Sequence, residues 1–306
     1  MYRETIPAAL TKTASDHRSR TALTFLRQGI VETELTFEQL LNEICRLASF
    51  FSDWGVRQGS RVVLFIPKSV YTVVSHFAAQ SLGAISVPLN PDFTRSEVKY
   101  LLEDATPQLI ICEPGKTDFL KDIYPRGNFY EVSTQTPYPD KEGEPTEPFI
   151  LPDIDSSADD PALIIYTSGT TGNPKGAVLT HRNLLHDARN INDTWEIKSS
   201  DIICHALPLF HVHGLCFALQ TPLRAGARIA MLDSYHPQHL LNELSRRSGV
   251  TVCTVFMAVP AMYTKLLDSC HNEKFDFSHL RLITSGSAPL LVKEFERITR
   301  FFGQEP

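Results

Sequence analysis

The chain has 306 residues, of which 42% are hydrophobic and 21% are charged, and its formal net charge is −6. These values are typical of a globular protein, and a negative charge without a dominant basic patch argues against a protein that binds nucleic acid regardless of sequence. The six cysteines show no C-x-x-C spacing and the N-terminus has no apolar signal core, so we expect reduced thiols and a cytoplasmic protein. Every apolar run is too short to span a bilayer, which leaves only peripheral membrane contact open.

The first third of the chain alternates between segments typical of helices and segments typical of strands. Capping boxes at residues 36–39 and 94–97 each precede apolar residues at helical spacing, and Ser69 is placed to cap another helix. Short apolar runs between these helices predict buried strands at 61–66, 84–87 and 109–112. The alternation predicts an α/β fold with a parallel sheet covered by helices on both faces.

Residues 124–160 differ from the rest of this region. They are rich in proline and acidic residues and have little periodicity. We interpret them as a long connection or a weakly structured excursion that carries no recognisable chemistry.

The stretch 164–176 contains the groups that are needed to hold a polyphosphate. An apolar, strand-like run ends at Tyr166 and passes directly into glycines and hydroxyl residues. Glycines let the backbone approach a ligand closely, successive N–H groups form an anion-binding concavity, and Lys175 adds a mobile charge. The alternative is a glycine-rich surface turn with a solvated lysine.

The residues around Lys175 distinguish this stretch from a Walker loop. That loop has glycine before the lysine and a hydroxyl residue after it, whereas here Pro174 precedes Lys175 and Gly176 follows it. An apolar run then leads to Thr180, which is placed to cap a helix. We therefore expect the loop to join two extended segments.

The second half of the chain returns to alternating elements. Helices are predicted at 237–246 and from Pro260 onward. Apolar runs predict strands at 202–206, 227–232, 250–255 and 280–284. Two α/β runs on either side of the acidic connection suggest two layered units.

Residues 166–176 closely resemble the AMP-binding signature of the adenylate-forming enzymes, which include acyl-CoA synthetases, nonribosomal peptide synthetase adenylation domains and firefly luciferase. The resemblance implies a large-domain fold with two stacked sheets in αβαβα layers and an incomplete small barrel. It implies interleaved subdomains at about 60–195 and at 1–59 with 196–306. The nucleotide-binding residues that it implies in this stretch are Thr167, Ser168, Gly169, Thr170, Thr171, Gly172 and Lys175.

The same resemblance implies an activity. A carboxylic acid would be activated with ATP to acyl-AMP and then transferred to CoA, so that ATP, Mg²⁺ and CoA are the expected cofactor and co-substrates. The Mg²⁺ ligand, a ribose-binding aspartate and a C-terminal domain with the catalytic lysine are expected beyond Pro306. A chain without them would retain at most nucleotide and acyl binding. The alternatives are a non-catalytic nucleotide-binding module and a simple NTPase.

A pair of histidines follows the predicted strand 202–206. His211 and His213 form an H-x-H pair, which can bind metal if a third ligand is near, or can be ordinary buried histidines. The segment also resembles the motif that borders the acyl pocket of acyl-CoA synthetases. The resemblance implies that His211 lies beside the reacting carboxylate and the thiol channel, and that His213 and Gly214 line the acyl pocket.

Small residues follow the predicted strand 280–284. A flat ring can lie against such a backbone, and ligands bind at strand C-termini in open α/β sheets. Taken alone, the segment is better explained as an ordinary strand-to-helix turn. The resemblance implies that adenine and the acyl group contact Gly286, Ser287, Ala288 and Pro289.

The sequence favours a mostly apolar acid, such as a fatty acid. Apolar residues on the predicted strand and helix before Lys265 would form the walls of the pocket, namely Val255, Met257, Val259 and Met262. The alternative is a malonate-like diacid, for which Lys265 or Arg281 would supply a cation. Synthetases that resemble this chain and act on such diacids commonly have arginine where Lys265 stands, and lysine lacks the bidentate fork.

Overall fold

The computed structural model describes residues 4–136, 138, 155–167, 173–270 and 275–306. The chain divides into two compact units, the first formed by Met1–Ser15 and Glu38–Asp187 and the second by Asp16–Phe37 and Ala188–Pro306. The boundaries fall inside the helices α1 (Ile6–His17), α2 (Phe37–Asp53) and α6 (His181–Trp195). Each unit contains its own six-stranded sheet, which confirms the predicted α/β class with two sheets.

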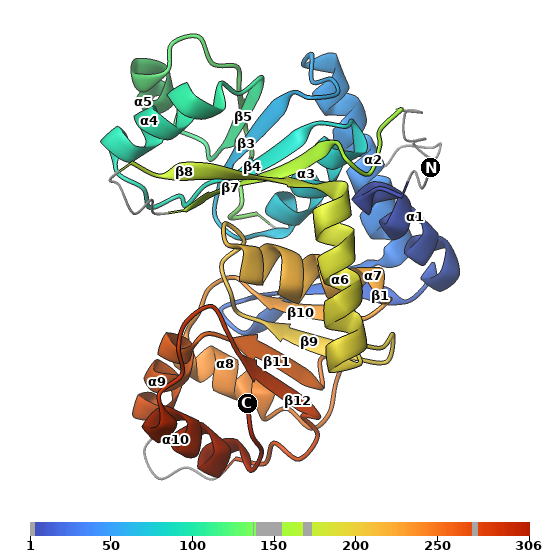
Figure 1. Cartoon of the computed structure of the whole chain (residues 1–306), viewed down its shortest axis with the longest axis vertical. Helices are drawn as coiled ribbons and strands as arrows, with labels where there is room; N and C mark the ends of the chain where they lie inside the picture. The colour runs from blue at the N-terminus through green and yellow to red at the C-terminus, as the bar shows by residue number, and fades with distance from the viewer. Residues whose placement is uncertain (1–3, 137, 139–154, 168–172, 271–274) are drawn as a thin grey trace. The chain divides into compact units, whose positions relative to one another are not determined.

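The sheet of the first unit has the strand order β6-β5-β3-β4-β7-β8. Its strands are β3 (Arg61–Phe65), β4 (Ile85–Pro88), β5 (Leu109–Cys112), β6 (Phe129–Glu131), β7 (Pro161–Thr167) and β8 (Lys175–Thr180). Neighbouring strands are parallel except for β7 and β8, which form an antiparallel hairpin (Figure 1). The prediction of parallel strands is therefore confirmed for β3 to β7, and β8 is the antiparallel exception.

Helices cover this sheet because alternate strand residues face opposite sides. Val63, Val87 and Ile110 lie in one buried cluster with the apolar residues of α4 (Arg95–Ala105) and α5 (Thr117–Ile123). The helix α3 (Val70–Ser81) packs on β3 and β4, and its His76 contacts Ser86 of β4. The remaining helix, α2 (Phe37–Asp53), completes the unit.

Local hydrogen bonds explain where these helices begin. The Ser69 hydroxyl accepts the Thr72 N–H at the start of α3, as predicted. At the start of α4, both hydrogen bonds of the predicted capping box between Thr94 and Glu97 are present. The Thr180 hydroxyl accepts the Asn183 N–H at the start of α6, which confirms the predicted cap.

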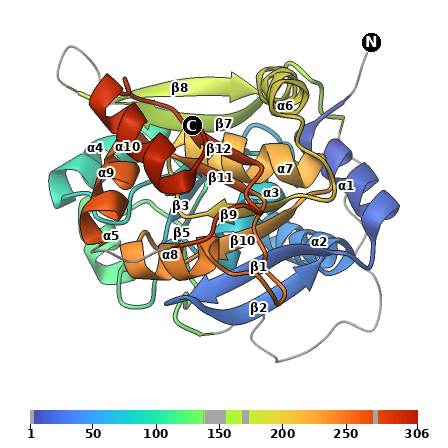
Figure 2. The same cartoon turned by 90° about the horizontal axis from the view of Figure 1, so that it is seen from below.

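The sheet of the second unit has the order β12-β11-β9-β10-β1-β2, which Figure 2 shows across its width. Its strands are β1 (Thr21–Arg27), β2 (Ile30–Thr36), β9 (Ile202–His205), β10 (Arg228–Leu232), β11 (Val255–Ala258) and β12 (Leu282–Ser285). The hairpin β1–β2 turns at Gln28 and Gly29, both with positive φ. The helices are η1 (His213–Gln220, a π-helix), α7 (Thr221–Arg224), α8 (Pro237–Leu244), α9 (Pro260–Ser269) and α10 (Val292–Phe302).

Three sequence predictions differ from the structure. The strand expected at 250–255 begins only at Val255. The Thr254 hydroxyl accepts the Ile202 N–H and donates to the Asp201 carboxylate. These side-chain hydrogen bonds replace a regular contact of the strand ladder. The connection 124–160 contains the strand β6, although residues 137 and 139–154 lie outside the described part. The helix α2 groups with the first unit, whereas the sequence placed residues 1–59 with the second.

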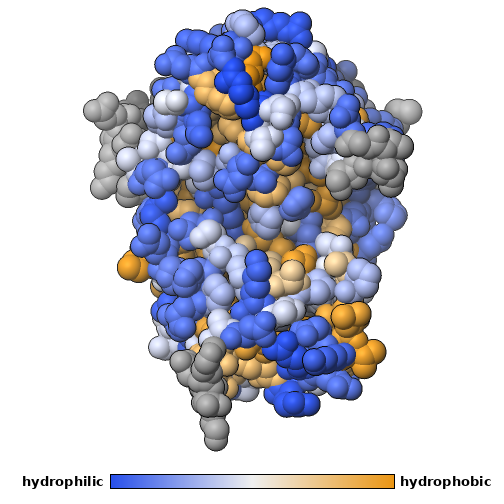
Figure 3. Space-filling view, turned by 90° about the vertical axis from the view of Figure 1, so that its left-hand side faces the viewer, coloured by the Kyte–Doolittle hydropathy of each residue, from blue (hydrophilic) through white to orange (hydrophobic). Residues whose placement is uncertain are grey.

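The surface gives no sign of a membrane span. Among the described residues, no helix is both long enough and apolar enough to cross a bilayer. On the face shown in Figure 3, hydrophilic side chains surround small groups of apolar ones. The most exposed large apolar side chains are Ile30, Leu291 and Val292, and five of the six cysteines are buried.

Candidate functional site

The hairpin β7–β8 holds the two ends of the predicted phosphate loop. Thr167 pairs with Lys175 and Tyr166 pairs with Gly176 in an antiparallel register, so the loop joins two extended segments, as expected. The strand β7 is buried up to Ile165, whereas Thr167 is exposed. Five predicted contact residues, Ser168, Gly169, Thr170, Thr171 and Gly172, lie outside the described residues.

Lys175 is available for a ligand. It is exposed at the first position of β8, and its ammonium forms no ion pair with any side chain that the structure describes. The next residue must be small, because a Cβ on Gly176 would lie 3.0 Å from Ile164 and 3.3 Å from the Tyr166 ring. The hairpin therefore places one unpaired cation directly beside the loop.

The second group of predicted residues lies in the second unit, around η1. His213 is buried and His211 is exposed, and desolvation lowers the pKa of both imidazoles. Gly214 is sterically required, because a Cβ there would lie 2.1 Å from the carbonyl oxygen of Pro208. This close approach fixes the start of the π-helix, a feature that is frequent at functional sites.

The structure brings His213 together with the segment after β12. The Nδ1 of His213 lies 3.0 Å from the Ser287 hydroxyl, and a Cβ on Gly286 would lie 3.3 Å from the His213 ring. Ser287 has a φ of 63°, which is uncommon for a residue other than glycine. Ala288 and Pro289 follow it on the surface. His213, Gly286 and Ser287, which were predicted to contact a ligand, therefore lie together in one cluster.

Polar atoms of His213 and of the last two residues of β12 lack partners. The buried Nε2 of His213, the hydroxyl of Thr284 and the hydroxyl of Ser285 make no hydrogen bond within the described residues. A buried polar atom without a partner costs on the order of 1–3 kcal/mol. A polar ligand or an ordered water could complete their hydrogen bonds.

The two cations proposed for a diacid differ in the structure. Arg281 donates to both carboxylate oxygens of Asp201 and to the carbonyls of Trp195 and Glu196, so its guanidinium is already used in the fold. Lys265 lies on the exposed side of α9 and forms no ion pair with a described residue. Nor do the described residues contain a group of three or more His, Cys, Asp or Glu side chains that could hold a metal, so His211 and His213 have no third ligand there.

The sequence did not reveal a pocket in the first unit. It has a volume of about 430 Å³ and lies where the strands β3, β4 and β5 end. Its lining residues are Phe65, Pro91, Phe93, Arg95, Pro114, Gly115, Lys116 and Phe119. Ligands of open α/β sheets bind at such carboxyl ends, and the Pro-Gly-Lys turn directly after a predicted strand was the signal that could have found it.

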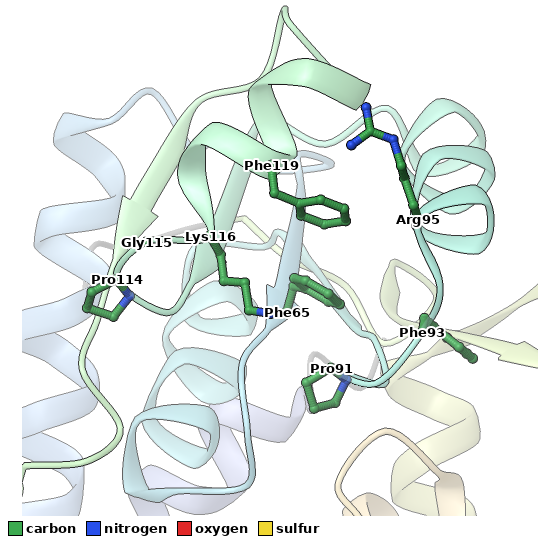
Figure 4. Close-up of a pocket in the computed structure, with 8 residues that line it drawn as sticks. All are labelled: Phe65, Pro91, Phe93, Arg95, Pro114, Gly115, Lys116 and Phe119. Carbon is green, nitrogen blue, oxygen red and sulfur yellow. The ribbon is translucent and has the colours of Figure 1, made fainter.

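The pocket combines aromatic rings with two cations. In Figure 4 the rings of Phe65 and Phe119 lie in its centre, Lys116 extends towards Phe65, and Arg95 lies on the α4 side. Arg95 forms an ion pair with Asp122 and lies 5.8 Å from the centre of the Phe119 ring. Lys116 is exposed and has no ion-pair partner in the described part of the chain. Rings beside cations suit a planar base that carries phosphate.

Comparison with known proteins identifies the class to which this fold and these sites belong. The model of the family described as AMP-binding enzyme matches residues 10–306, and the chain belongs to this family. A mouse (Mus musculus) malonate–CoA ligase ACSF3, mitochondrial, is 33% identical over 274 residues, which are 84% of this chain and 46% of the relative. 4-Coumarate–CoA ligase 3 of Arabidopsis thaliana is 32% identical over 260 residues, 81% of this chain and 45% of the relative.

A solved structure agrees with these relatives. ATP-bound MatB from Rhodopseudomonas palustris has a TM-score of 0.86 at 30% identity, and the match covers 98% of this chain and 58% of that one. The described fold is therefore that of an adenylate-forming enzyme. The chain spans about half the length of the curated relatives that it matches.

Proposed function

We propose that the protein takes part in the ATP-dependent activation of a carboxylic acid and its transfer to CoA. The carboxylate oxygen attacks the α-phosphorus of ATP, pyrophosphate leaves, and an acyl-adenylate forms. The CoA thiol then attacks the acyl carbonyl, AMP leaves, and the thiol proton passes to solvent. The observation that carries this proposal is the β7–β8 hairpin with its unpaired Lys175, in a chain of the AMP-binding enzyme family.

The hairpin supplies electrostatic stabilisation in this proposal. Charge accumulates on the phosphates as the carboxylate attacks, and fixed donors beside it lower the barrier. Lys175 and the loop backbone are the groups of this chain that would face the phosphates. Mg²⁺ would neutralise further charge, but the described residues offer no cluster to hold it, so we assign no step to a protein-bound metal.

For the acid, the structure shifts our preference from a fatty acid to a short, polar acid of the malonate type. Val255 and Met257, two of the expected apolar walls, have no exposed surface, so no ligand atom has room beside them. The buried Nε2 of His213, which has no hydrogen-bond partner among the described residues, instead favours a polar contact. Malonate–CoA ligases among the relatives support the same choice.

We further propose that the pocket at the ends of β3, β4 and β5 holds the phosphorylated end of CoA. ATP is assigned to the hairpin, and CoA is the other reactant that carries adenine and phosphates. Phe65 and Phe119 would contact the base, and Lys116 would contact a phosphate.

The test of the overall function is ATP–pyrophosphate exchange with malonate, acetate, butyrate and octanoate, measured on the 306 residues joined to the C-terminal domain that the family resemblance implies. Exchange that requires an acid and is fastest with malonate supports the proposal. ATP hydrolysis without acid would favour an NTPase, and nucleotide binding without exchange would favour a binding module. Fastest exchange with octanoate would restore the fatty-acid assignment.

The test of the pocket is calorimetry with CoA and with 3′-dephospho-CoA. We expect Lys116→Ala to weaken CoA binding about tenfold, as for the loss of one hydrogen bond to a charged group. Equal CoA affinity in the wild-type and variant proteins would contradict the assignment. Lys121→Ala is a matched control, because Lys121 lies on α5 but does not line the pocket.

A further inference from the structure

The helix α4 contacts both stems of the hairpin that carries the phosphate loop. The Tyr100 hydroxyl donates to the carbonyl oxygen of Pro174 at 3.2 Å, just before β8 begins. The Tyr166 hydroxyl, near the end of β7, donates to the Asp104 carboxylate at 2.6 Å. One contact therefore precedes the loop in sequence and the other follows it.

The spacing of Tyr100 and Asp104 places both contacts on one side of α4. Tyr100 and Asp104 are four residues apart on α4, so they lie on the same face, one turn from each other. The neighbouring face of α4 is buried through Val98, Leu101 and Leu102. A helix fixed in the core thus presents two polar groups to the hairpin.

Two further contacts hold this arrangement in place. Arg61 donates to the carbonyl oxygens of Ala105 and Thr106 and to the Thr106 hydroxyl, which satisfies the C-terminal end of α4. The Tyr166 ring lies against the backbone of Gly176, its partner across the hairpin. Burial, and then the hydrogen bond to Asp104, raises the pKa of Tyr166, so its hydroxyl stays protonated and can donate.

We propose that Tyr100 and Asp104 are positioning residues that hold the two stems of the hairpin, and with them Lys175, ready for nucleotide. This inference rests on the proposed function of the hairpin, but the contacts themselves do not. Because β8 is an edge strand, its ladder partner among the described strands is β7 alone, so losing these contacts would weaken the support of the hairpin. An arrangement of Lys175 that is ready to bind nucleotide would then be populated for less of the time, and the apparent affinity falls by the same fraction.

The variants are Tyr166→Phe, Tyr100→Phe and Asp104→Ala, with Asp104→Asn as the conservative replacement that keeps an acceptor. Tyr138→Phe is the matched control. It removes a tyrosine–carboxylate hydrogen bond of the same length, 2.6 Å to Glu43, in the same unit but away from the hairpin. All variants are made in the 306-residue chain.

Two readouts separate this inference from the proposed function. Hydrogen exchange of the β8 amides measures how firmly the hairpin is held, and calorimetry with ATP measures nucleotide affinity. We expect faster β8 exchange in the first three variants and not in Tyr138→Phe, with ATP affinity reduced about three- to tenfold and partly restored in Asp104→Asn.

Each outcome decides one of the two ideas. Unchanged β8 exchange, or affinity losses that match those of Tyr138→Phe, would overturn the positioning role. A wild-type chain that binds no ATP while β8 exchange still responds to the variants would overturn the proposed function and leave the contact between α4 and the hairpin established.

Discussion

The two units present their candidate site residues in opposite ways. The first exposes a cation, Lys175, on an edge strand beside a glycine-rich loop. The second holds neutral polar groups, with the buried His213 against the exposed Ser287 and an imidazole pKa that burial lowers. Exposed charge suits the phosphates of a nucleotide, which arrive hydrated, whereas buried neutral donors suit groups that must leave water before they react.

The largest expected effect concerns pH and the first unit. Burial lowers the pKa of His76 to about 3 and that of His181 to about 4. Unfolded imidazoles bind protons near pH 6.5 and these folded ones do not, so folding stability falls as the pH drops from about 6.5 towards 4. The two shifts amount to a loss on the order of several kcal/mol.

Urea unfolding between pH 7.5 and pH 4.5 measures this effect. His76→Gln removes one titrating group and keeps a polar side chain beside Ser86, so its stability should depend less on pH than that of the wild type. His236→Gln is the control, because His236 is an exposed histidine of the second unit. The same pH dependence in the His76 variant and the wild type would refute the assignment.

The next effect concerns the second unit, where Gly214→Ala should be strongly destabilising. The added methyl would lie 2.1 Å from the Pro208 carbonyl, and relieving the clash requires movement of the backbone. We expect a loss of about 3 kcal/mol or more in the free energy of unfolding. Gly59→Ala is the comparison, because its φ is 78° but it has open space, so strain alone should cost about 1–2 kcal/mol. Equal losses would show that the contact with Pro208 is relieved easily.

Smaller changes in the free energy of unfolding should distinguish the cluster around His213 from the exposed Lys265. Ser287→Ala leaves the Nδ1 of His213 without its partner and should lower the unfolding free energy by about 1–2 kcal/mol. Lys265→Ala, an exposed change in the same unit, should stay within about 0.5 kcal/mol. Thermal unfolding of both variants tests this difference. A neutral Ser287→Ala would mean that this hydrogen bond does not stabilise the cluster.

The sequence predicted those parts of the molecule that local chemistry determines. The caps at Ser69 and Thr94 were visible because side-chain hydrogen bonds to the first helical turn need particular residues at fixed spacing. The hairpin around the loop was visible because an apolar strand, glycines and a second apolar run follow one another in the chain. Both signals lie within a few residues, so tertiary structure was not needed to read them.

Features that depend on distant residues were not predictable. The contact of His213 with Ser287 joins residues 74 positions apart, and the donation of Tyr166 to Asp104 joins residues 62 apart. The pocket at the strand ends requires three strands to meet, and the turn that carries Lys116 is only a weak local signal for it. The prediction of a strand at 250–255 was wrong for the same reason. The Thr254 hydroxyl forms hydrogen bonds with Asp201 and Ile202, which are about 50 residues earlier in the chain.

The central claim is that the hairpin of the first unit holds the phosphates of a nucleotide. The most direct test is calorimetric titration of the 306-residue chain and its Lys175→Ala variant with ATP, at low and at moderate salt. We predict that the variant binds ATP about tenfold more weakly at low salt, that the difference shrinks as salt screens the charge, and that the melting temperature is unchanged. Equal ATP affinity in the two proteins at both salt concentrations would contradict the account.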